Sequence, residues 1–406
     1  MSKKLLYILA TILIIGSLPA EARRAKKKKE EPPKVEDVMA QLNDAFFAYD
    51  IDLAEQKIEV LRTLPEGISA EQIDSIEQRV NRMSEMIQRV EDIVVIDSLT
   101  LHRDDFFRHY RMASSAGTLS SPEEHHYESA DSTIFYTTQN KQLMIWGGQE
   151  GLLQSRSLTD GTREDPTPLS DVLNHGGIAN YPFLLSDGIT LYFATKGTDS
   201  LGGLDLYMTR SDRDNYAIPQ NLGMPYNSPY DDYMLAIDEE TGIGWFATDR
   251  NRLGDLITVY IFIPNSVRKN LSLNTINLKN RARLTSIADT QNPDEDYSNI
   301  LQNIANIKDD SASAPKADFI LAFPNGTVYK NWSDFKSPQA RRLMETYIDA
   351  QAEIQEDAKT LETLRLNYKP GDSKTDNTIL SIEKKLKQAS NTLRRLSNQV
   401  INTELK

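Results

Sequence analysis

Apolar residues in the first quarter of the chain recur at helical intervals. Spacings of three and four residues place such a set on one helix face, and the stripe of the first predicted helix consists of Val38, Leu42, Ala45, Phe46 and Tyr49. A second helix is predicted over 53–64, where Pro65-Glu66-Gly67 ends it. Ser69 and Gln72 form the capping-box pattern that opens a third helix. The pattern predicts a helical region over residues 35–97.

The period changes to that of β-strands between residues 129 and 264. One unit repeats here with an offset of 53 residues, because Phe193-Ala194-Thr195 returns as Phe246-Ala247-Thr248 and Tyr207 returns as Tyr260. Each unit reads strand, turn, strand, loop, strand, and Asp187-Gly188 suits the tight turn because glycine accepts positive φ. A weaker copy precedes them. A period of about 50 residues with several strands per unit is typical of propeller blades.

The C-terminal part returns to a helical pattern. Residues 286–316 are rich in Asp, Asn, Ser and Ala and are predicted to be a linker with one short helix. Residues 317–329 are predicted to form a β-hairpin. Two long helices follow within residues 336–406, separated by residues 369–373, and predict an antiparallel helical hairpin or coiled coil. Folding back within the chain and pairing with a partner helix are both open.

The strand units carry a family resemblance. The string from Asn180 to Tyr207, continued by Asn221-Leu222-Gly223 and Asn227-Ser228, resembles the WD40-like (PD40) repeat of TolB-type β-propellers. The marks are a Ser-x-Asp-Gly hairpin, an apolar strand ending near Phe-x-Thr, and a Gly-Gly-x-Asp-x-Tyr strand. The linker 219–228 resembles the variant in large envelope proteins of Bacteroidota, although Asp249-Arg250 stands where that family usually has Asn-Arg. The resemblance implies a periplasmic or surface-associated binding platform rather than a catalyst.

The resemblance implies a propeller-type domain over residues 120–335. Only three units are visible, whereas closed propellers typically have about 4–8 blades. Further blades within 147–178 and 266–335, or an open array of sheets completed by other elements, are the alternatives. The first helix pair faintly resembles one tetratricopeptide repeat, which cannot bury its own apolar face. The predicted fold class is multidomain α+β, with an N-terminal helical hairpin, central β-propeller-like blades and C-terminal antiparallel coiled-coil helices.

Composition removes most site chemistry. The 406 residues include no cysteine and five histidines, which excludes disulfides, thiolate metal sites and cysteine nucleophiles. A net charge of −13 argues against nucleic-acid binding through bulk electrostatics. The chain lacks Gly-x-Ser-x-Gly, and the run Glu123-Glu124-His125-His126 lacks the spacing of a helical zinc motif. No catalytic, cofactor-binding or metal-binding residue is predicted.

The N-terminus has the three parts of a secretory signal peptide. Lys3 and Lys4 precede the apolar run 5–15, and Ala20-Glu21-Ala22 supplies a cleavage site. A membrane anchor would need about 20 apolar residues, so residues 1–22 are predicted to be removed. No cysteine follows the run, so a lipoprotein is not expected. The expected location is the periplasm or the periphery of the outer membrane.

Removal of the leader would expose a basic arm, residues 23–34. The rest of the chain is strongly acidic, so the charge is segregated between arm and body. The cations of the arm are Arg23, Arg24, Lys26, Lys27, Lys28 and Lys29. The arm is either a solvated tail or an electrostatic tether to an anionic membrane surface or an acidic partner.

Aromatic and acidic residues gather before the last repeat unit. The candidate binding face consists of Tyr226, Tyr230, Asp231, Asp232 and Tyr233. Packing of these aromatic rings between blades is the alternative. Asp231-Asp232 and residues 238–240 offer oxygen ligands for Ca²⁺, but a structural role is favoured for them.

The sequence therefore favours a non-enzymatic cell-envelope scaffold, or a protein-binding component of a periplasmic or outer-membrane assembly. Other envelope proteins are the expected partners, no cofactor is expected, and the oligomeric state is open. The alternative is a carbohydrate- or peptide-binding propeller module. A weaker alternative is a glycan-active enzyme with acidic catalysts on the blade loops.

Overall fold

The computed structural model describes the larger part of the chain after Glu31-Pro32. The described residues are 33–64, 67–130, 132–174, 176–212, 215–307, 319, 321–323, 327–329, 331–366 and 373–405. The predicted signal peptide and the six cations of the basic arm lie outside them. Within them, no helix is both long and apolar enough to cross a membrane.

Three helices begin the fold: α1 (Val35–Phe47), α2 (Ile51–Thr63) and α3 (Ala70–Ile87). All five residues of the predicted apolar stripe are buried, four of them on α1 and Tyr49 in the turn after it. The predicted capping box at the start of α3 is confirmed, because Gln72 N donates to Ser69 Oγ at 3.2 Å and Ser69 N donates to Gln72 Oε1 at 2.9 Å. The three helices pack on one another around a shared apolar cluster.

The predicted helical region is too long at its C-terminal end. The structure replaces the end of that region with strand β1 (Val94–His102), which pairs antiparallel with β14 (Leu256–Ile263). The Val-Val-Ile sequence that opens β1 favours a strand, since β-branched side chains suit the pleated sheet. A short apolar run of this kind has no period that separates helix from strand.

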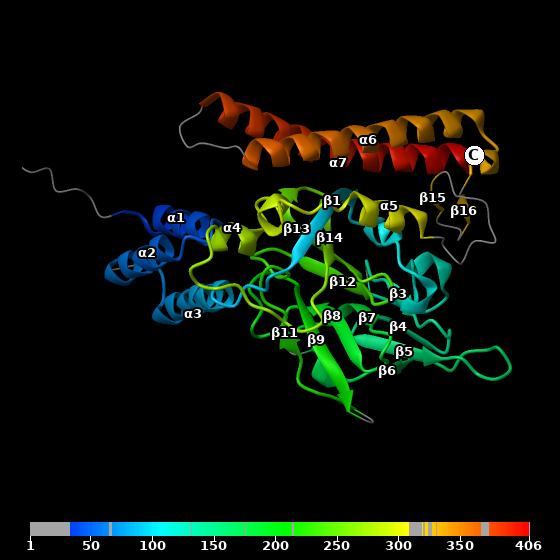
Figure 1. Ribbon diagram of the computed structural model, residues 1–406, viewed down its shortest axis with the longest axis horizontal. Helices are drawn as coiled ribbons and strands as arrows, with labels where there is room; N and C mark the ends of the chain where they lie inside the picture. The colour runs from blue at the N-terminus through cyan, green and yellow to red at the C-terminus, as the bar shows by residue number, and fades with distance from the viewer. Residues whose placement is uncertain are drawn as a thin grey trace, which may run out of the picture.

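The middle of the chain forms three antiparallel sheets (Figure 1). Sheet 1 contains β2 (Thr118–Ser120), β3 (Phe135–Thr137), β4 (Leu143–Gly147), β5 (Leu152–Arg156) and β6 (Thr167–Pro168). Sheet 2 contains β7 (Asn180–Leu184), β8 (Thr190–Thr195), β9 (Asp205–Asp212), β10 (Asn215–Tyr216) and β11 (Gln220–Asn221). Sheet 3 contains β12 (Asp232–Asp238), β13 (Ile243–Leu253), β14 and β1.

The 53-residue repeat has the same register in two sheets. Phe193 lies opposite Tyr207 in sheet 2, and Phe246 lies opposite Tyr260 in sheet 3. The strand content predicted for each unit is therefore confirmed. The described residues form no closed barrel or propeller. Residues 152–168 extend sheet 1, and the only further sheet among the described residues is the two-stranded pair β15 (Leu321–Ala322) and β16 (Val328–Tyr329).

One apolar core joins the three sheets. Strand β12 lies against sheet 2, and β7 of sheet 2 lies against β3 and β4 of sheet 1. Tyr110, in the segment between β1 and β2, stacks on Trp245 and donates a hydrogen bond to the backbone oxygen of Met234. Short 3₁₀ turns occur at η1 (Phe106–His109), η2 (Ser114–Ala116), η3 (Pro122–Glu124), η4 (Asp171–Asn174) and η6 (Trp332–Asp334).

The short helix predicted within 286–316 is confirmed, but the described part of this segment is packed on the fold rather than a free linker. After the short helix α4 (Leu278–Arg283), the turn η5 (Ile287–Thr290) and helix α5 (Ser298–Asn306) follow. Tyr297 and Ile304 are buried in the core of the sheets. Polar composition concealed the few apolar residues that attach this segment.

The predicted C-terminal helical hairpin is confirmed. Helices α6 (Pro338–Leu366) and α7 (Ser373–Glu404) pack on each other and lie across the top of sheet 3 in Figure 1. Leu253 and Leu256 of sheet 3 belong to the same apolar cluster as the hairpin. Folding back within the chain is therefore the alternative that the structure shows.

The free edge of β1 is covered by side chains of the later segments. Thr100 N donates to Gln355 Oε1 at 3.0 Å, and the Gln355 amide donates back to Thr100 O. Farther along the strand, Val95 N donates to Thr290 Oγ1 at 2.9 Å, and Gln291 Nε2 donates to Val95 O at 2.9 Å. An uncovered edge strand presents unpaired backbone groups to other chains. Here the amide of Gln355 bonds Thr100 as a neighbouring strand would.

We expect Gln355→Ala to lower the free energy of unfolding by about 1–3 kcal/mol, because two backbone groups of Thr100 lose their partners. Chemical denaturation measures this change. Gln388→Ala is the matched control, since Gln388 is exposed on α7. Equal stability of the two variants would show that Gln355 does not hold the edge.

Candidate functional site

The structure separates the five residues of the predicted binding face. Tyr226, Asp232 and Tyr233 are buried, whereas Tyr230 and Asp231 are partly exposed. Tyr226 packs edge-on against Phe246 at a ring separation of 5.5 Å. The interpretation of all five as one exposed face is therefore wrong. For Tyr226 and Tyr233, packing inside the fold is the alternative that the structure shows.

Asp231 holds sheets 2 and 3 together. Its Oδ1 accepts a hydrogen bond from Leu204 N at 2.8 Å. A Cβ atom at Gly203 would lie 1.9 Å from that oxygen, and one at Gly202 would lie 2.0 Å from the backbone oxygen of Tyr230. Glycine suits both positions, because the Tyr230 backbone approaches Gly202 closely and the Asp231 carboxylate approaches Gly203 closely. The Gly-Gly of the repeat therefore serves sheet packing.

A second polar group lies buried beside this contact. Asp205 is fully buried and accepts hydrogen bonds from Leu201 N, Gly202 N and Asn221 Nδ2 at 3.0, 3.1 and 2.8 Å. Burial raises the pKa of Asp205 to about 7, and the nearby Asp232 carboxyl adds to the rise, although the three donors oppose it. Asn227 extends the network by bonding both backbone groups of Leu206.

Asp232 and Arg250 form a buried ion pair. Arg250 Nη2 lies 3.1 Å from Asp232 Oδ1 and also donates to the backbone oxygens of Pro225 and Tyr226 at 2.9 and 2.8 Å. Burial raises the pKa of Asp232, and the Arg250 guanidinium opposes that rise. The pair fixes the residue 225–226 backbone against sheet 3.

A β-bulge in β13 presents the side chains around Arg250. Thr248 lies opposite Thr258 and Leu253 opposite Leu256, so the register shifts between these two pairs. Arg252, within the shift, has a left-handed φ of 55°. Bulges re-aim side chains and are frequent beside functional sites. This one sends Arg250 into the core, while Asn251 accepts a hydrogen bond from Arg365 of α6 at 3.2 Å.

The bulge borders a cleft of about 630 Å³, a volume in the range of small-ligand sites. Four parts of the chain meet there: the turn after α1, sheet 3, the end of α4 and the C-terminal hairpin. The lining residues are Phe47, Tyr49, Tyr230, Arg250, Asn251, Arg283, Leu284, Thr285, Arg365, Asp376, Ile379, Leu380 and Glu383.

One wall of the cleft combines aromatic rings with arginines. Phe47 and Tyr230 stack with ring centres 4.9 Å apart. The guanidinium carbon of Arg252 lies 5.9 and 5.8 Å from these two ring centres, and that of Arg283 lies 5.5 Å from the ring of Tyr49. These distances suit cation–π attraction. Among the described residues, neither Arg252 nor Arg283 has an ion-pair partner within 4 Å.

The opposite wall comes from the C-terminal hairpin. Leu380 is 61 % exposed, an unusual state for a leucine beside a cleft. Arg365 and Glu383, which also line the cleft, form an ion pair at 2.7 Å. The cleft therefore places the guanidinium of Arg283, which has no ion-pair partner among the described residues, near aromatic and aliphatic surface. That combination suits an anionic group carried on an apolar body.

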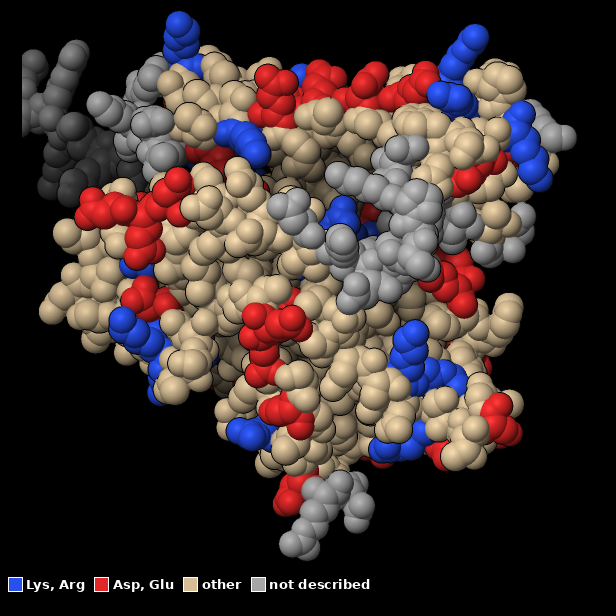
Figure 2. Space-filling view, turned by 45° about the vertical axis from the view of Figure 1, so that its right-hand side comes forward, with Lys and Arg blue, Asp and Glu red and all other residues tan. Residues whose placement is uncertain are grey.

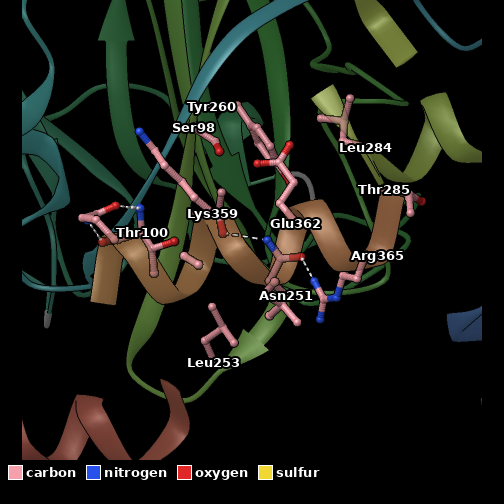
Figure 3. A pocket seen from close by; sticks show the side chains of 14 residues that line it. Ser98, Thr100, Asn251, Leu253, Tyr260, Leu284, Thr285, Lys359, Glu362 and Arg365 are labelled. Carbon is pink, nitrogen blue, oxygen red and sulfur yellow. Dashed lines mark hydrogen bonds between the residues drawn. The ribbon is translucent and has the colours of Figure 1, made fainter. Parts of the chain in front are cut away.

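A second cavity lies between α6 and sheet 3 (Figure 3). Its volume of about 40 Å³ leaves room for about one or two waters. Figure 3 shows Glu362 of α6 beside Tyr260 of the sheet, and Arg365 hydrogen-bonded to Asn251. Burial raises the pKa of Glu362. This cavity is an internal polar seam beneath the hairpin rather than a ligand site.

The described residues contain no group of three or more His, Asp or Glu side chains placed to hold a metal ion. His125, from the run that the sequence singled out, stacks on Phe135 and shares a hydrogen bond with Ser120 at 2.7 Å. Comparisons with protein-family models, with curated proteins and with solved structures found no match. The chemistry of the site must be judged from its own residues.

Sequence reasoning found Tyr230 but missed the rest of the cleft. Phe47 lies outside the apolar stripe of α1, and Arg283 and Leu380 come from distant parts of the chain. The only local signal was the Asp249-Arg250 departure from the family pattern, which falls in the bulge. The other contacts arise from tertiary packing.

We expect the stability contributed by Asp205 to fall as the pH rises. Its folded-state pKa of about 7 exceeds the unfolded value, so the folded protein binds more protons between these values. The contribution is present below about pH 4 and is lost as the pH passes 7. Denaturation of wild type and Asp205→Asn across this range should show their difference shrinking by at least about 1 kcal/mol. A constant difference would contradict the assignment.

Asp232→Ala should lower the free energy of unfolding by about 3–5 kcal/mol, because it leaves the buried Arg250 without its counter-charge. Asp212→Ala, at an exposed aspartate, is the control. The double variant Asp232→Leu/Arg250→Met should recover part of the loss. Thermal and chemical unfolding measure all three variants. A double variant that is less stable than Asp232→Ala would contradict the role assigned to the ion pair.

Proposed function

We propose that this protein is a non-enzymatic, exported component of the cell envelope that binds a partner protein through a β-propeller-like platform. The leader pattern of residues 1–22 supports export. The repeated units, with Phe193 and Phe246 in equivalent register opposite their tyrosines, support the resemblance to PD40 repeats and TolB-type propellers. The position of β1 beside β14 supports it further, since the first strand then completes the last sheet.

The cleft between the N-terminal helices, sheet 3 and the C-terminal hairpin carries the proposal. Four separate parts of the chain line it, including the end of α4, so an occupant would contact all of them at once. Aromatic residues and arginines are the side chains that most often dominate binding energy at protein interfaces. A partner segment with a carboxylate next to an apolar side chain matches Arg283, the Phe47–Tyr230 stack and the exposed Leu380.

The acidic residues of the cleft do not favour the enzyme alternative. Its two carboxylates, Asp376 and Glu383, are seven residues apart on α7, which is about 10 Å along a helix axis. Glycosidases hold their carboxyl pair closer, at about 5–9.5 Å. Glu383 also forms an ion pair with Arg365, and no histidine of the described residues lines the cleft. Binding without turnover is the simpler use of this arrangement.

The test is site-specific crosslinking in intact envelopes. A photoreactive residue in place of Leu380 should give one defined protein adduct, and the same residue in place of Leu158 should not. Leu158 is the control because it is also partly exposed but lies in the turn after β5 of sheet 1. Tyr230→Ala with Arg283→Glu should weaken the adduct by about tenfold, as expected for interface anchors.

Equal adducts from positions 380 and 158, or none from either, would contradict the proposal. So would an adduct from position 380 that survives the Tyr230→Ala/Arg283→Glu changes. Unfolding curves of each variant exclude loss of the fold as the cause.

A further inference from the structure

One stretch of this acidic protein carries no acidic residue. Residues 256–288 contain neither Asp nor Glu, although the chain has 59 of them. The contrast is visible on the C-terminal hairpin, where acidic side chains gather along the top of the molecule (Figure 2). The cations of the acid-free stretch are Arg268, Lys269, Lys279, Arg281 and Arg283.

The same stretch exposes large aliphatic side chains. Val267 is 79 % exposed, Leu273 is 63 % exposed and Ile276 is 85 % exposed. Single exposed apolar residues are common on protein surfaces. Three of this size within ten residues are not, and they mark an interaction surface.

The backbone that carries these side chains is held firmly. Leu271 N donates to Val90 O at 2.8 Å, and Asp92 N donates to Lys269 O at 2.7 Å. Arg268 donates from both Nη atoms to backbone oxygens, at 2.8 Å to Leu222 and 3.0 Å to Arg89. Leu271 and Leu278 pack against the N-terminal helices. The exposure of Leu273 and Ile276, between these two anchors, is therefore built into the fold.

The stretch keeps an excess of positive charge after its ion pairs are counted. Asp92 lies 2.7 Å from Arg281 and 3.9 Å from Lys269, and Glu91 lies 3.6 Å from Arg268. Two carboxylates thus oppose five cations. Within the described chain, Lys279 and Arg283 have no ion-pair partner, and Lys269 is paired only loosely at 74 % side-chain exposure.

The acid-free stretch meets the C-terminal end of α1. Arg283 lies 5.5 Å from the ring of Tyr49, two residues beyond α1, and Figure 1 shows α4 beside α1. Val35, which follows the predicted arm, is at the other end of α1, about 18 Å away along the helix axis. The arm and the acid-free stretch are therefore two separate sources of positive charge.

We propose that residues 264–281 form a docking surface for an anionic phospholipid bilayer. Val267, Leu273 and Ile276 enter the boundary between headgroups and acyl chains, while Lys269 and Lys279 contact the headgroup phosphates. Peripheral membrane binding of this kind combines buried apolar area with attraction to anionic lipid. The surface is aliphatic and has no aromatic anchor or groove, which favours lipid over a protein partner. This inference is independent of the cleft and of what binds there.

The chain has no cysteine, so a single introduced thiol reports on one position. Ile276→Cys carrying an environment-sensitive fluorophore should shift to the blue with phosphatidylcholine–phosphatidylglycerol vesicles and not with phosphatidylcholine alone. Ile218→Cys is the control, because Ile218 is 71 % exposed outside the stretch. Absence of a shift at Ile276, or an equal shift at Ile218, would overturn the proposal.

Vesicle co-sedimentation of the full mature chain gives a second measurement. Val267→Ser/Leu273→Ser/Ile276→Ser should weaken binding to the mixed vesicles by at least about tenfold, whereas Ile218→Ser should not. Lys269→Glu/Lys279→Glu should also weaken it and reduce its dependence on salt. Replacing the six arm cations by serine separates the contribution of the arm. Undiminished binding by the triple variant would overturn the proposal.

The same variants would show whether a second copy of the chain or a protein partner covers this surface instead of lipid. If the triple serine variant changes only the oligomeric state in solution, a second copy of the chain covers the surface and the proposal is wrong. If it changes only the crosslinks to an envelope protein, a protein partner is the occupant. Failure of the crosslinking at position 380 would leave this result unaffected, because the two surfaces carry separate variants.

Discussion

The pairing of β1 with β14 is the contact on which the rest of the structure depends. It attaches the N-terminal helices to the last sheet, across more than 150 residues of intervening chain. It also creates an edge whose backbone groups are taken up by Gln355 of α6 and by Thr290 of η5. Sheet 3 therefore joins the helices at the start of the chain with the hairpin at its end. The cleft exists because these parts meet on the same sheet.

Local periodicity predicted the local structure well. The α1 stripe, the α3 capping box and the 53-residue offset each rest on residues close in sequence, and each is confirmed. Strand β1 was missed because the short apolar run ending in Val94-Val95-Ile96 has no decisive period. Tyr226 and Tyr233 were misjudged as exposed because residue type does not show which side of a loop faces the core. The cleft itself needed Phe47, Arg283 and Leu380 brought together from distant segments, which no local pattern records.

The acidic residues are distributed unevenly, and their surroundings differ from one part of the fold to another. Asp205 and Asp232 lie inside the sheets, where burial raises their pKa values and neighbouring donors or Arg250 hold their oxygens. On α6, Glu345, Asp349, Glu353 and Glu356 are exposed, whereas Glu362 lies in the polar cavity beneath the hairpin. The acid-free stretch 256–288 is a third environment, in which the chain keeps its positive charge next to exposed aliphatic groups. Net charge alone describes none of these three regions.

The order in which the elements leave the ribosome or a translocation channel follows from the position of β1. A chain that emerges N-terminus first contains β1 long before β14, and Gln355 is later still. Sheets 1 and 2 are built from strands that are close together in the sequence. Sheet 3 can form only after β14, which ends at Ile263, has been synthesised. Contacts this distant slow folding, because the loop between them must be closed first. Until then β1 has both edges open, and a chain that ends before α6 keeps one of them open permanently.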